Sequence, residues 1–250
     1  MTASAPALAI LVAMDDELEP FLAHAEHVGP AKKVGNAVHR HATLAGHPVV
    51  LIRTGIGLVN AAGAATTAIL HAQREEGRSL PLLISAGSAG GLGAEVRVGD
   101  VVVGTDYINV DADARAFGYK LGQVPGMPAN YLAAEHVAEA ILASQALRAG
   151  TVHQGLIVSS YSFVTPARAE LITRDFPGAL ATDMESSAIA QTCHVHGVPF
   201  ISVRGISDLC GPAAQDDFRD QVDDAATQSA NLVISAIDAL VGATGADTLV

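Results

Sequence analysis

Residues 181–208 read A-T-D-M-E-S-S-A-I-A-Q-T-C-H-V-H-G-V-P-F-I-S-V-R-G-I-S-D and carry two acidic motifs on either side of a helical pattern and a strand. The first motif is Asp183-Met184-Glu185-Ser186, and the second is Arg204-Gly205-Ile206-Ser207-Asp208. Each carboxylate follows an apolar run, and parallel sheets bind ligands beyond the carboxyl ends of their strands. We therefore expect Glu185 and Asp208 to face one small ligand from neighbouring strand ends.

Apolar runs alternate with amphipathic stretches on both sides of this segment. Short aliphatic runs predict strands, and apolar residues three or four positions apart predict helices. The predicted strands are 8–13, 39–44, 49–53, 82–85, 101–108, 151–159, 179–183 and 200–206; the predicted helices are 60–73, 131–148, 167–175, 186–196 and 217–241. This alternation predicts an α/β fold in which a mostly parallel sheet has helices on both faces. No repeat or linker divides the chain, so we expect one domain over 1–250 with a loose tail at 242–250.

The composition excludes several classes of protein. The net charge of −12 argues against nucleic acid as a partner, because phosphates require clustered Lys and Arg. No apolar run approaches the roughly 20 residues that span a bilayer, so no membrane partner is expected. The N-terminal apolar run meets acidic residues at once, which argues against a signal peptide. The two cysteines, Cys193 and Cys210, predict free thiols. We expect a cytoplasmic protein.

Two turns rich in small residues also follow predicted strands. Residues 54–57 (T-G-I-G) carry two of the three glycines of a dinucleotide fingerprint, but Asn60 stands at the third position and the turn follows a hairpin. Residues 86–93 (A-G-S-A-G-G-L-G) have no Lys after their glycines and are therefore not a nucleotide-triphosphate loop. Glycines at these positions let backbone N–H groups approach a ligand. No organic cofactor is expected.

One stretch of the sequence also suggests a possible metal site. Cys193-His194-Val195-His196 lies in a predicted helix, where residues two positions apart point in different directions. No second group of Cys and His stands at ligand spacing. We therefore expect no metal ion.

Three carboxylates, those of Glu17, Glu185 and Asp208, follow apolar strands in equivalent positions. Hydrolysis of a glycosidic bond needs one acid for the leaving group and one base for water, around a transition state that resembles an oxocarbenium ion. The residues alone thus point to a small-molecule hydrolase or transferase.

Eight ordered motifs between Leu8 and Ile237 resemble the 5′-methylthioadenosine/S-adenosylhomocysteine nucleosidases of the purine nucleoside phosphorylase superfamily. They are A-M-D-D-E (13–17), T-G-I-G (54–57), G-S-A-G-G-L (87–92), V-G-D-V-V-V (98–103), D-A-D-A-R-A-F-G-Y (111–119), G-L-I-V-S (155–159), D-M-E-S (183–186) and V-R-G-I-S-D (203–208). The resemblance implies a three-layer α/β/α domain around a mixed, twisted sheet, a homodimer, and a reaction without cofactor or metal. It implies hydrolysis of adenosine thioethers to adenine and a 5-thioribose.

The same resemblance assigns roles residue by residue. Asp208 is expected to protonate adenine N7, with Ser207 positioning it. Glu17 and Ser88 are expected to activate the attacking water. Glu185 is expected to bind the ribose hydroxyls. Arg204, grouped with the substrate-binding residues, is expected to hold Glu185 in place. The remaining expected contacts to substrate come from the first acidic motif, the glycine-rich turn, the aromatic residues and the thioether pocket: Met184, Ala89, Gly90, Phe163, Val164, Met14, Ile56 and Phe218, with Phe117 supplied by the dimer partner.

Three alternatives remain open at this point. A futalosine-type hydrolase would need a positive partner for an aromatic carboxylate, which Arg115 could supply. A purine nucleoside phosphorylase would need cations around phosphate, but residues 8–17 and 82–91 contain no Arg or Lys. A nucleoside-binding protein without activity would not need both an acid and a base.

Overall fold

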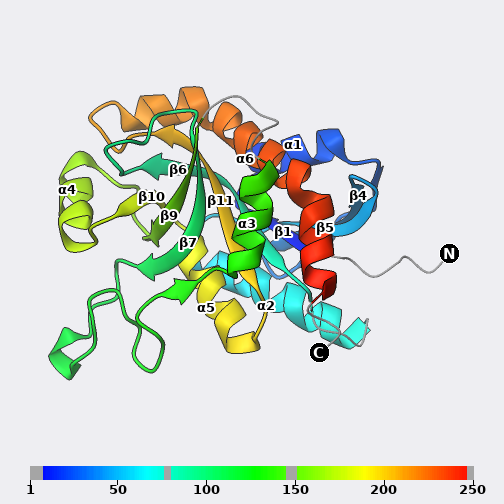
Figure 1. The fold of residues 1–250 in the computed structure, drawn as a ribbon, viewed down its shortest axis with the longest axis horizontal. Coiled ribbons are helices and arrows are strands. Elements are labelled where there is room, and N and C mark those ends of the chain that lie inside the picture. The colour runs from blue at the N-terminus through cyan, green and yellow to red at the C-terminus, as the bar shows by residue number, and fades with distance from the viewer. Residues whose placement is uncertain (1–7, 76–79, 145–150, 247–250) are drawn as a thin grey trace.

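The helices and strands follow the predicted alternation along the chain (Figure 1). They are taken from a computed structural model, which describes residues 8–75, 80–144 and 151–246. The strands are β1 (Leu8–Val12), β2 (His27–Val28), β3 (Lys32–Val34), β4 (Ala37–Leu44), β5 (His47–Arg53), β6 (Leu83–Gly91), β7 (Val101–Asn109), β8 (Tyr131–Leu132), β9 (Val152–Ser159), β10 (Ala179–Asp183) and β11 (Phe200–Asp208). The helices are α1 (Asp15–His24), α2 (Leu58–Glu75), α3 (Glu135–Ala143), α4 (Pro166–Asp175), α5 (Ser186–His196) and α6 (Ala214–Ala246), with a 3₁₀ turn at Arg115–Phe117.

The strands form one mixed sheet in the order β10-β9-β7-β11-β6-β1-β5-β4-β2, with β3 beside β4 and β8 beside β7. The pairs β5–β1, β1–β6, β6–β11, β7–β9 and β9–β10 are parallel, whereas β11–β7 and the pairs at the margins are antiparallel. The fold class predicted from the sequence, an α/β fold around a mixed sheet, is confirmed.

An additional antiparallel pairing of β10 with β6 closes one half of the sheet into a ring. Ala181 pairs with Gly91, and Thr182 pairs with Gly90. The acidic motifs therefore do not come from neighbouring strands as expected, because β6 lies between β10 and β11. Since both strands pair with the glycine-rich end of β6, their carboxyl ends still meet over it.

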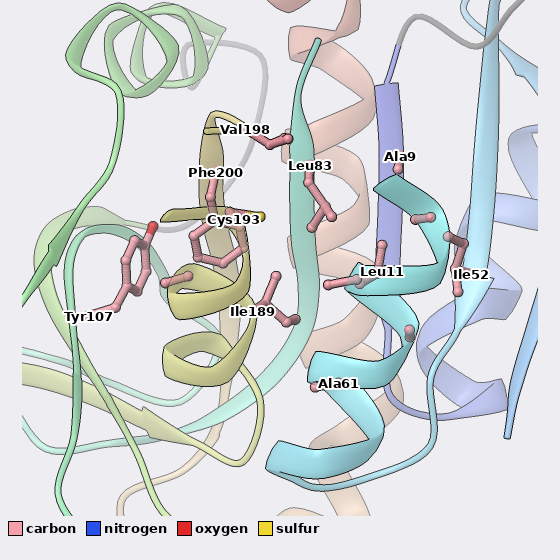
Figure 2. Packing of buried hydrophobic residues seen from close by; sticks show 14 of the residues in the cluster. Ala9, Leu11, Ile52, Ala61, Leu83, Tyr107, Ile189, Cys193, Val198 and Phe200 are labelled. Atoms are coloured by element: carbon pink, nitrogen blue, oxygen red, sulfur yellow. The ribbon is translucent and has the colours of Figure 1, made fainter. Parts of the chain in front are cut away.

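Helices cover both faces of the sheet, and strand periodicity decides which side chains they bury. Alternate residues of a strand point to opposite faces. Ala9 and Leu11 of β1 pack toward α2 and α5, whereas Leu8, Ile10 and Val12 pack toward α1, α3 and α6. Figure 2 shows Leu11 and Leu83 on the same side of the sheet as Ala61 of α2 and Ile189 of α5. Fully burying a large aliphatic side chain contributes about 1.5–3 kcal/mol, so these two layers stabilise the sheet that carries the site.

Two predicted strands are longer than expected. Residues 86–91 were predicted to leave the sheet as a turn, but β6 continues through Gly91. The cause is tertiary, because this small-residue segment pairs with β11 on one side and β10 on the other. Likewise, β11 extends to Asp208 rather than ending at Ile206. The acid is therefore the last residue of a buried strand.

The predicted helix over 131–148 is wrong at its start. Tyr131 and Leu132 form β8, which pairs with Asp106 and Tyr107, and the helix begins only at Glu135. Short apolar segments fit a strand or a helix equally well by periodicity alone. The predicted end of this helix falls partly outside the described residues.

Further differences concern short strands and both ends of α6, which begins at Ala214 rather than at Asp217. The strands β2 and β3 were not predicted; they pair only with β4 at the margin of the sheet. The helix α6 continues five residues past its predicted end at Val241, which places the start of the expected tail inside the helix. Within the described residues, no helix is both long and apolar enough to cross a bilayer.

Candidate active site

A cavity of about 220 Å³ opens where β6, β10 and β11 end. Its lining combines the three predicted carboxylates and Asp183 with small, polar and apolar residues from several elements: Ala13, Met14, Glu17, Ile56, Ser88, Ala89, Gly90, Phe163, Thr182, Asp183, Met184, Glu185, Ser207, Asp208 and Phe218. A smaller lobe between Phe163 and Asp208 adds Ser162, Val164 and Cys210. The structure thus brings together carboxylates that stand up to 191 residues apart in the sequence, at positions 17 and 208.

Glu17 lies in the first turn of α1 and is almost fully buried. Its Oε2 accepts hydrogen bonds from the backbone N–H groups of Ala13 (2.7 Å) and Met14 (3.3 Å), which the start of a helix leaves without intrahelical partners. Its Oε1 accepts from the N–H (2.8 Å) and the hydroxyl (3.0 Å) of Ser88. Four donors therefore fix one carboxylate.

Gly87 provides the space for this carboxylate. A Cβ at this position would lie 2.3–2.8 Å from the carboxyl atoms of Glu17, and the φ angle of +147° is one that L residues rarely adopt. The glycine-rich end of β6 is thus shaped around Glu17, as well as around its pairing with β10 and β11.

Asp208 ends β11 and is 3% exposed. Its Oδ2 accepts from the Ser207 hydroxyl (3.1 Å), and its Oδ1 accepts from the Cys210 N–H (2.9 Å). Ser207 also donates to the Ala89 carbonyl (3.3 Å) and so ties the acid to β6. Burial raises the pKa of Asp208, while the hydrogen bonds from Cys210 and Ser207 act in the opposite direction. A raised pKa favours the protonated form, which an acid catalyst requires.

Glu185 stands just before α5 and accepts hydrogen bonds from Gly57 N–H (2.9 Å) and Met184 N–H (3.2 Å). The first of these bonds joins the 54–57 turn to the first acidic motif. Burial raises the pKa of Glu185 to about 7, against the attraction of Arg204, and the charges of Asp183 and Glu17 add to the rise. Glu17 and Glu185 are therefore close enough to influence each other's charge.

Arg204 is 1% exposed and lies behind the cavity rather than in its lining. Its closest carboxylate is Asp183, with Nε–Oδ2 at 3.0 Å, whereas Nη1 is 3.7 Å from Glu185 Oε2. It also donates to the hydroxyls of Ser85 (2.6 Å) and Ser202 (3.1 Å). Its guanidinium therefore supports Asp183 at close range and Glu185, which it was expected to hold in place, at longer range.

Asp183 lines the cavity, although it was not among the predicted site residues. Its Oδ1 accepts from the Ser159 hydroxyl (2.6 Å) and from the N–H groups of Glu185 (3.2 Å) and Ser186 (3.1 Å), so it binds the backbone just before and at the start of α5. Cys210 and Thr182 also line the site without having been predicted.

Apolar and aromatic residues form the mouth of the cavity. The rings of Phe163 and Phe218 meet edge to face, with centroids 6.0 Å apart and an interplanar angle of 77°. Met14, Ile56 and Met184 lie in the same lining. Phe163 and Ile56 are about half exposed, which leaves their outer faces open to solvent.

Phe117, which was expected to complete the partner's pocket, lies away from the cavity of its own chain. Phe117 belongs to the exposed 3₁₀ turn and is 83% exposed. Its neighbour Arg115 is paired with Asp113 through two hydrogen bonds of 2.9 and 2.7 Å. Val164 lines only the smaller lobe.

The lining carries negative charge without positive charge. Neither lobe contains a Lys, Arg or His among the described residues. Over the described ranges, no group of three or more His, Cys, Asp and Glu has the geometry to hold a metal ion. The site can therefore supply an acid, a carboxylate fixed by four donors and an apolar mouth.

The fold and the site are those of the phosphorylase superfamily: the family model of that description matches residues 7–238, and the chain belongs to this family. Within it, the chain is similar to the 5′-methylthioadenosine/S-adenosylhomocysteine nucleosidases. It is 42% identical to that of Anoxybacillus flavithermus over 203 residues (80% of this chain and 84% of the relative). It is 39% identical to that of Chromohalobacter salexigens over 231 residues (90% and 94%).

A solved structure agrees with these relatives. The nucleosidase of Neisseria meningitidis in complex with methylthio-immucillin-A superposes with a TM-score of 0.85 at 38% identity, covering 92% of this chain and 97% of that one. The similarity therefore extends over the sheet and the site, and it is not confined to one motif.

Proposed function

We propose that the protein hydrolyses the N-glycosidic bond of 5′-methylthioadenosine and S-adenosylhomocysteine, releasing adenine and a 5-thioribose. The observation that carries the proposal is the arrangement of Glu17, Glu185 and Asp208 around one cavity. Relatives that are 39–42% identical over most of their length bear the names of nucleosidases for these two substrates.

Asp208 acts as the general acid at adenine N7. Protonation there makes adenine a neutral leaving group as the bond from C1′ to the base breaks. The raised pKa of Asp208, caused by burial, keeps the proton available. Ser207 holds the carboxyl group in place through Oδ2.

Glu17 acts as the base that takes a proton from the attacking water, with Ser88 beside it. The four hydrogen bonds to Glu17 fix its position before substrate arrives, and preorganisation of this kind reduces the barrier. The oxygen of the water forms the new bond to C1′, and its proton passes to Glu17.

Glu185 binds the ribose hydroxyls as an acceptor. Its own donors, Gly57 and Met184, leave lone pairs that can face the sugar. Phe163 packs on adenine with the Val164 backbone at its edge, beside Ala89 and Gly90. Met14, Ile56, Met184 and Phe218 enclose the sugar and the thioether group, a role that suits the apolar mouth.

The charges of the lining favour water over phosphate as the nucleophile. A phosphate dianion needs cationic partners, and the described lining contains none. The same absence weakens the futalosine-type alternative, because Arg115 is paired with Asp113 and does not line the cavity of its own chain.

The substrates can be separated by one comparison of rates. Purified protein is assayed for adenine release from 5′-methylthioadenosine, S-adenosylhomocysteine, 5′-deoxyadenosine and aminodeoxyfutalosine. We expect kcat/KM to be highest for the two thioethers. Faster turnover of aminodeoxyfutalosine than of both thioethers would contradict the proposed specificity.

We also propose a homodimer in the cytoplasm, formed through the mouth of the cavity. Exposed apolar residues lie there: Val59, Tyr161 and Ile56 are each about half exposed or more. The Tyr161 hydroxyl accepts a hydrogen bond from Val59 N–H (2.9 Å), so these two residues lie side by side. Phe117, 83% exposed, would enter the partner's cavity. Light scattering of Val59→Glu tests the dimer: a monomeric variant is expected, and an unchanged mass would contradict this interface.

A further inference from the structure

The thiol of Cys210 lies beside the Asp208 carboxyl group in the smaller lobe of the cavity. The Cys210 backbone N–H donates to Asp208 Oδ1 at 2.9 Å. A Cβ built on Gly90 would lie 2.6 Å from Cys210 Sγ and 3.2 Å from Asp208 Oδ1. The sulfur and the carboxyl oxygen therefore flank the same point of β6, and an alanine at position 90 would collide with the thiol.

The backbone of Cys210 adopts an uncommon conformation to reach this place. Its φ angle is +53°, in the left-handed region that non-glycine residues seldom adopt. Cys210 is 3% exposed and belongs to a buried cluster with Val158, Val164 and Phe176, which holds it there. Strained backbone that persists in this way is concentrated at functional sites.

We propose that the Cys210 side chain is a positioning residue for the general acid: it contacts Asp208 at the Oδ1 side, while Ser207 holds Oδ2. This inference rests on the proposed function, in which Asp208 donates the proton. Two neighbours on opposite oxygens fix the rotation of the carboxyl group, so that its proton points into the cavity.

The contact has a chemical consequence besides orientation. Burial raises the pKa of the Cys210 thiol to about 12, so the thiol stays protonated and acts as a weak donor throughout the working range. Its interaction with Asp208 lowers the pKa of that carboxyl group, against burial and against the charge of Asp217 on α6. The other titratable groups of the cavity, Glu17, Glu185 and Asp183, are present in every variant considered below.

Replacing the thiol tests the inference through the pH dependence of kcat/KM for adenine release. In Cys210→Ala and Cys210→Gly, Asp208 should keep its proton to higher pH. For each protein, kcat/KM on the alkaline side of the profile is divided by its value at the optimum. We expect this ratio to be about threefold higher in the two variants than in the wild type. Cys210→Ser retains a donor and keeps the wild-type limb. Cys193→Ala, which removes the other buried thiol from α5, is the matched control and leaves the limb in place. Superimposable profiles for Cys210→Ala and the wild type would overturn the inference.

A second readout does not depend on catalysis. The titration of Asp208 can be followed by NMR in protein labelled with ¹³C at aspartate Cγ, with the resonance assigned by its loss in Asp208→Asn. The midpoint is expected to move to higher pH in Cys210→Ala and Cys210→Gly, and an unchanged midpoint would refute the contact. If the wild type releases no adenine, the proposed function fails, while this titration still decides the role of Cys210.

Discussion

The Glu17 carboxylate accepts hydrogen bonds from both the backbone N–H and the hydroxyl of Ser88, at 2.8 and 3.0 Å. The two residues stand 71 positions apart, on α1 and β6, and the parallel pairing of β1 with β6 brings them together. This contact joins the first motif of the chain to the glycine-rich strand, and several predictions depend on it.

Glu17→Gln should lower kcat by about 10²–10⁴, the usual range for a general base, because the amide cannot take the proton of the water. Gln retains the shape of Glu, but its amide nitrogen cannot accept the hydrogen bonds of one carboxylate oxygen, so thermal unfolding is compared with the wild type beside analogue binding. Ser88→Ala keeps the N–H donor and should lose only about tenfold. Steady-state kinetics together with calorimetry of analogue binding measure both effects. Full activity in Glu17→Gln would refute its assignment as base.

Gly87→Ala should abolish most activity, because the new Cβ would occupy the place of the Glu17 carboxyl group. Displacing that group also costs about 1–3 kcal/mol of stability, as other overpacked sites do. Gly63→Ala is the matched control: nothing lies within 4 Å of its Cβ, it lies in α2, and alanine there should stabilise the helix by up to about 1 kcal/mol. Thermal unfolding and kcat are measured for both. If Gly87→Ala were fully active, β6 would tolerate a methyl group beside the Glu17 carboxyl group, and the steric argument would be wrong.

Asp208→Asn should lower kcat by about 10²–10⁴, because no proton can be delivered to the leaving base. Asp216→Asn changes an exposed aspartate of α6 and serves as the control. Assays with nucleosides that carry a better leaving group should show a smaller loss in Asp208→Asn. Equal losses for good and poor leaving groups would argue against acid catalysis.

Glu185→Gln should raise stability at alkaline pH. The folded pKa of Glu185, about 7, lies above its ordinary value of 4.5, so the fold favours the protonated form. That contribution is fully present below pH 4.5 and is lost as the pH rises through 7. Because Gln stays neutral, the Tm of the variant relative to the wild type should increase between pH 5 and pH 8. The variant should also show a higher KM, because a carboxylate is the stronger acceptor for ribose hydroxyls. A Tm difference that is constant or falls with pH would contradict the burial argument.

The order of elements could be predicted from the sequence because it depends on local patterns. The hairpin of β4 and β5 is an example: apolar alternation flanks a turn in which Ala45 and Gly46 both have positive φ angles. Residues 186–196 likewise form a helix with the predicted bounds, which ends at the left-handed Gly197.

The closure of the ring could not be predicted, because it depends on a long-range pairing. Residues 86–91 are small and carry turn signals, yet β10 and β11 hold them in the sheet. The ion pair of Asp183 could not be predicted for the same reason. Its partner Arg204 lies on β11, and no spacing in the sequence indicates that the two residues meet. The carboxylates were recognisable by their positions after strands, whereas the supporting contacts required the structure.

The most direct test of the account is the identity of the nucleophile. Purified protein is incubated with 5′-methylthioadenosine in buffer free of phosphate and again with added inorganic phosphate, and the sugar product is identified by mass spectrometry. The site contains a fixed carboxylate for water and no cation in its described lining, so adenine and free 5-methylthioribose should form at the same rate in both buffers. Formation of a sugar 1-phosphate, with turnover that requires phosphate, would contradict the claim that water is the nucleophile.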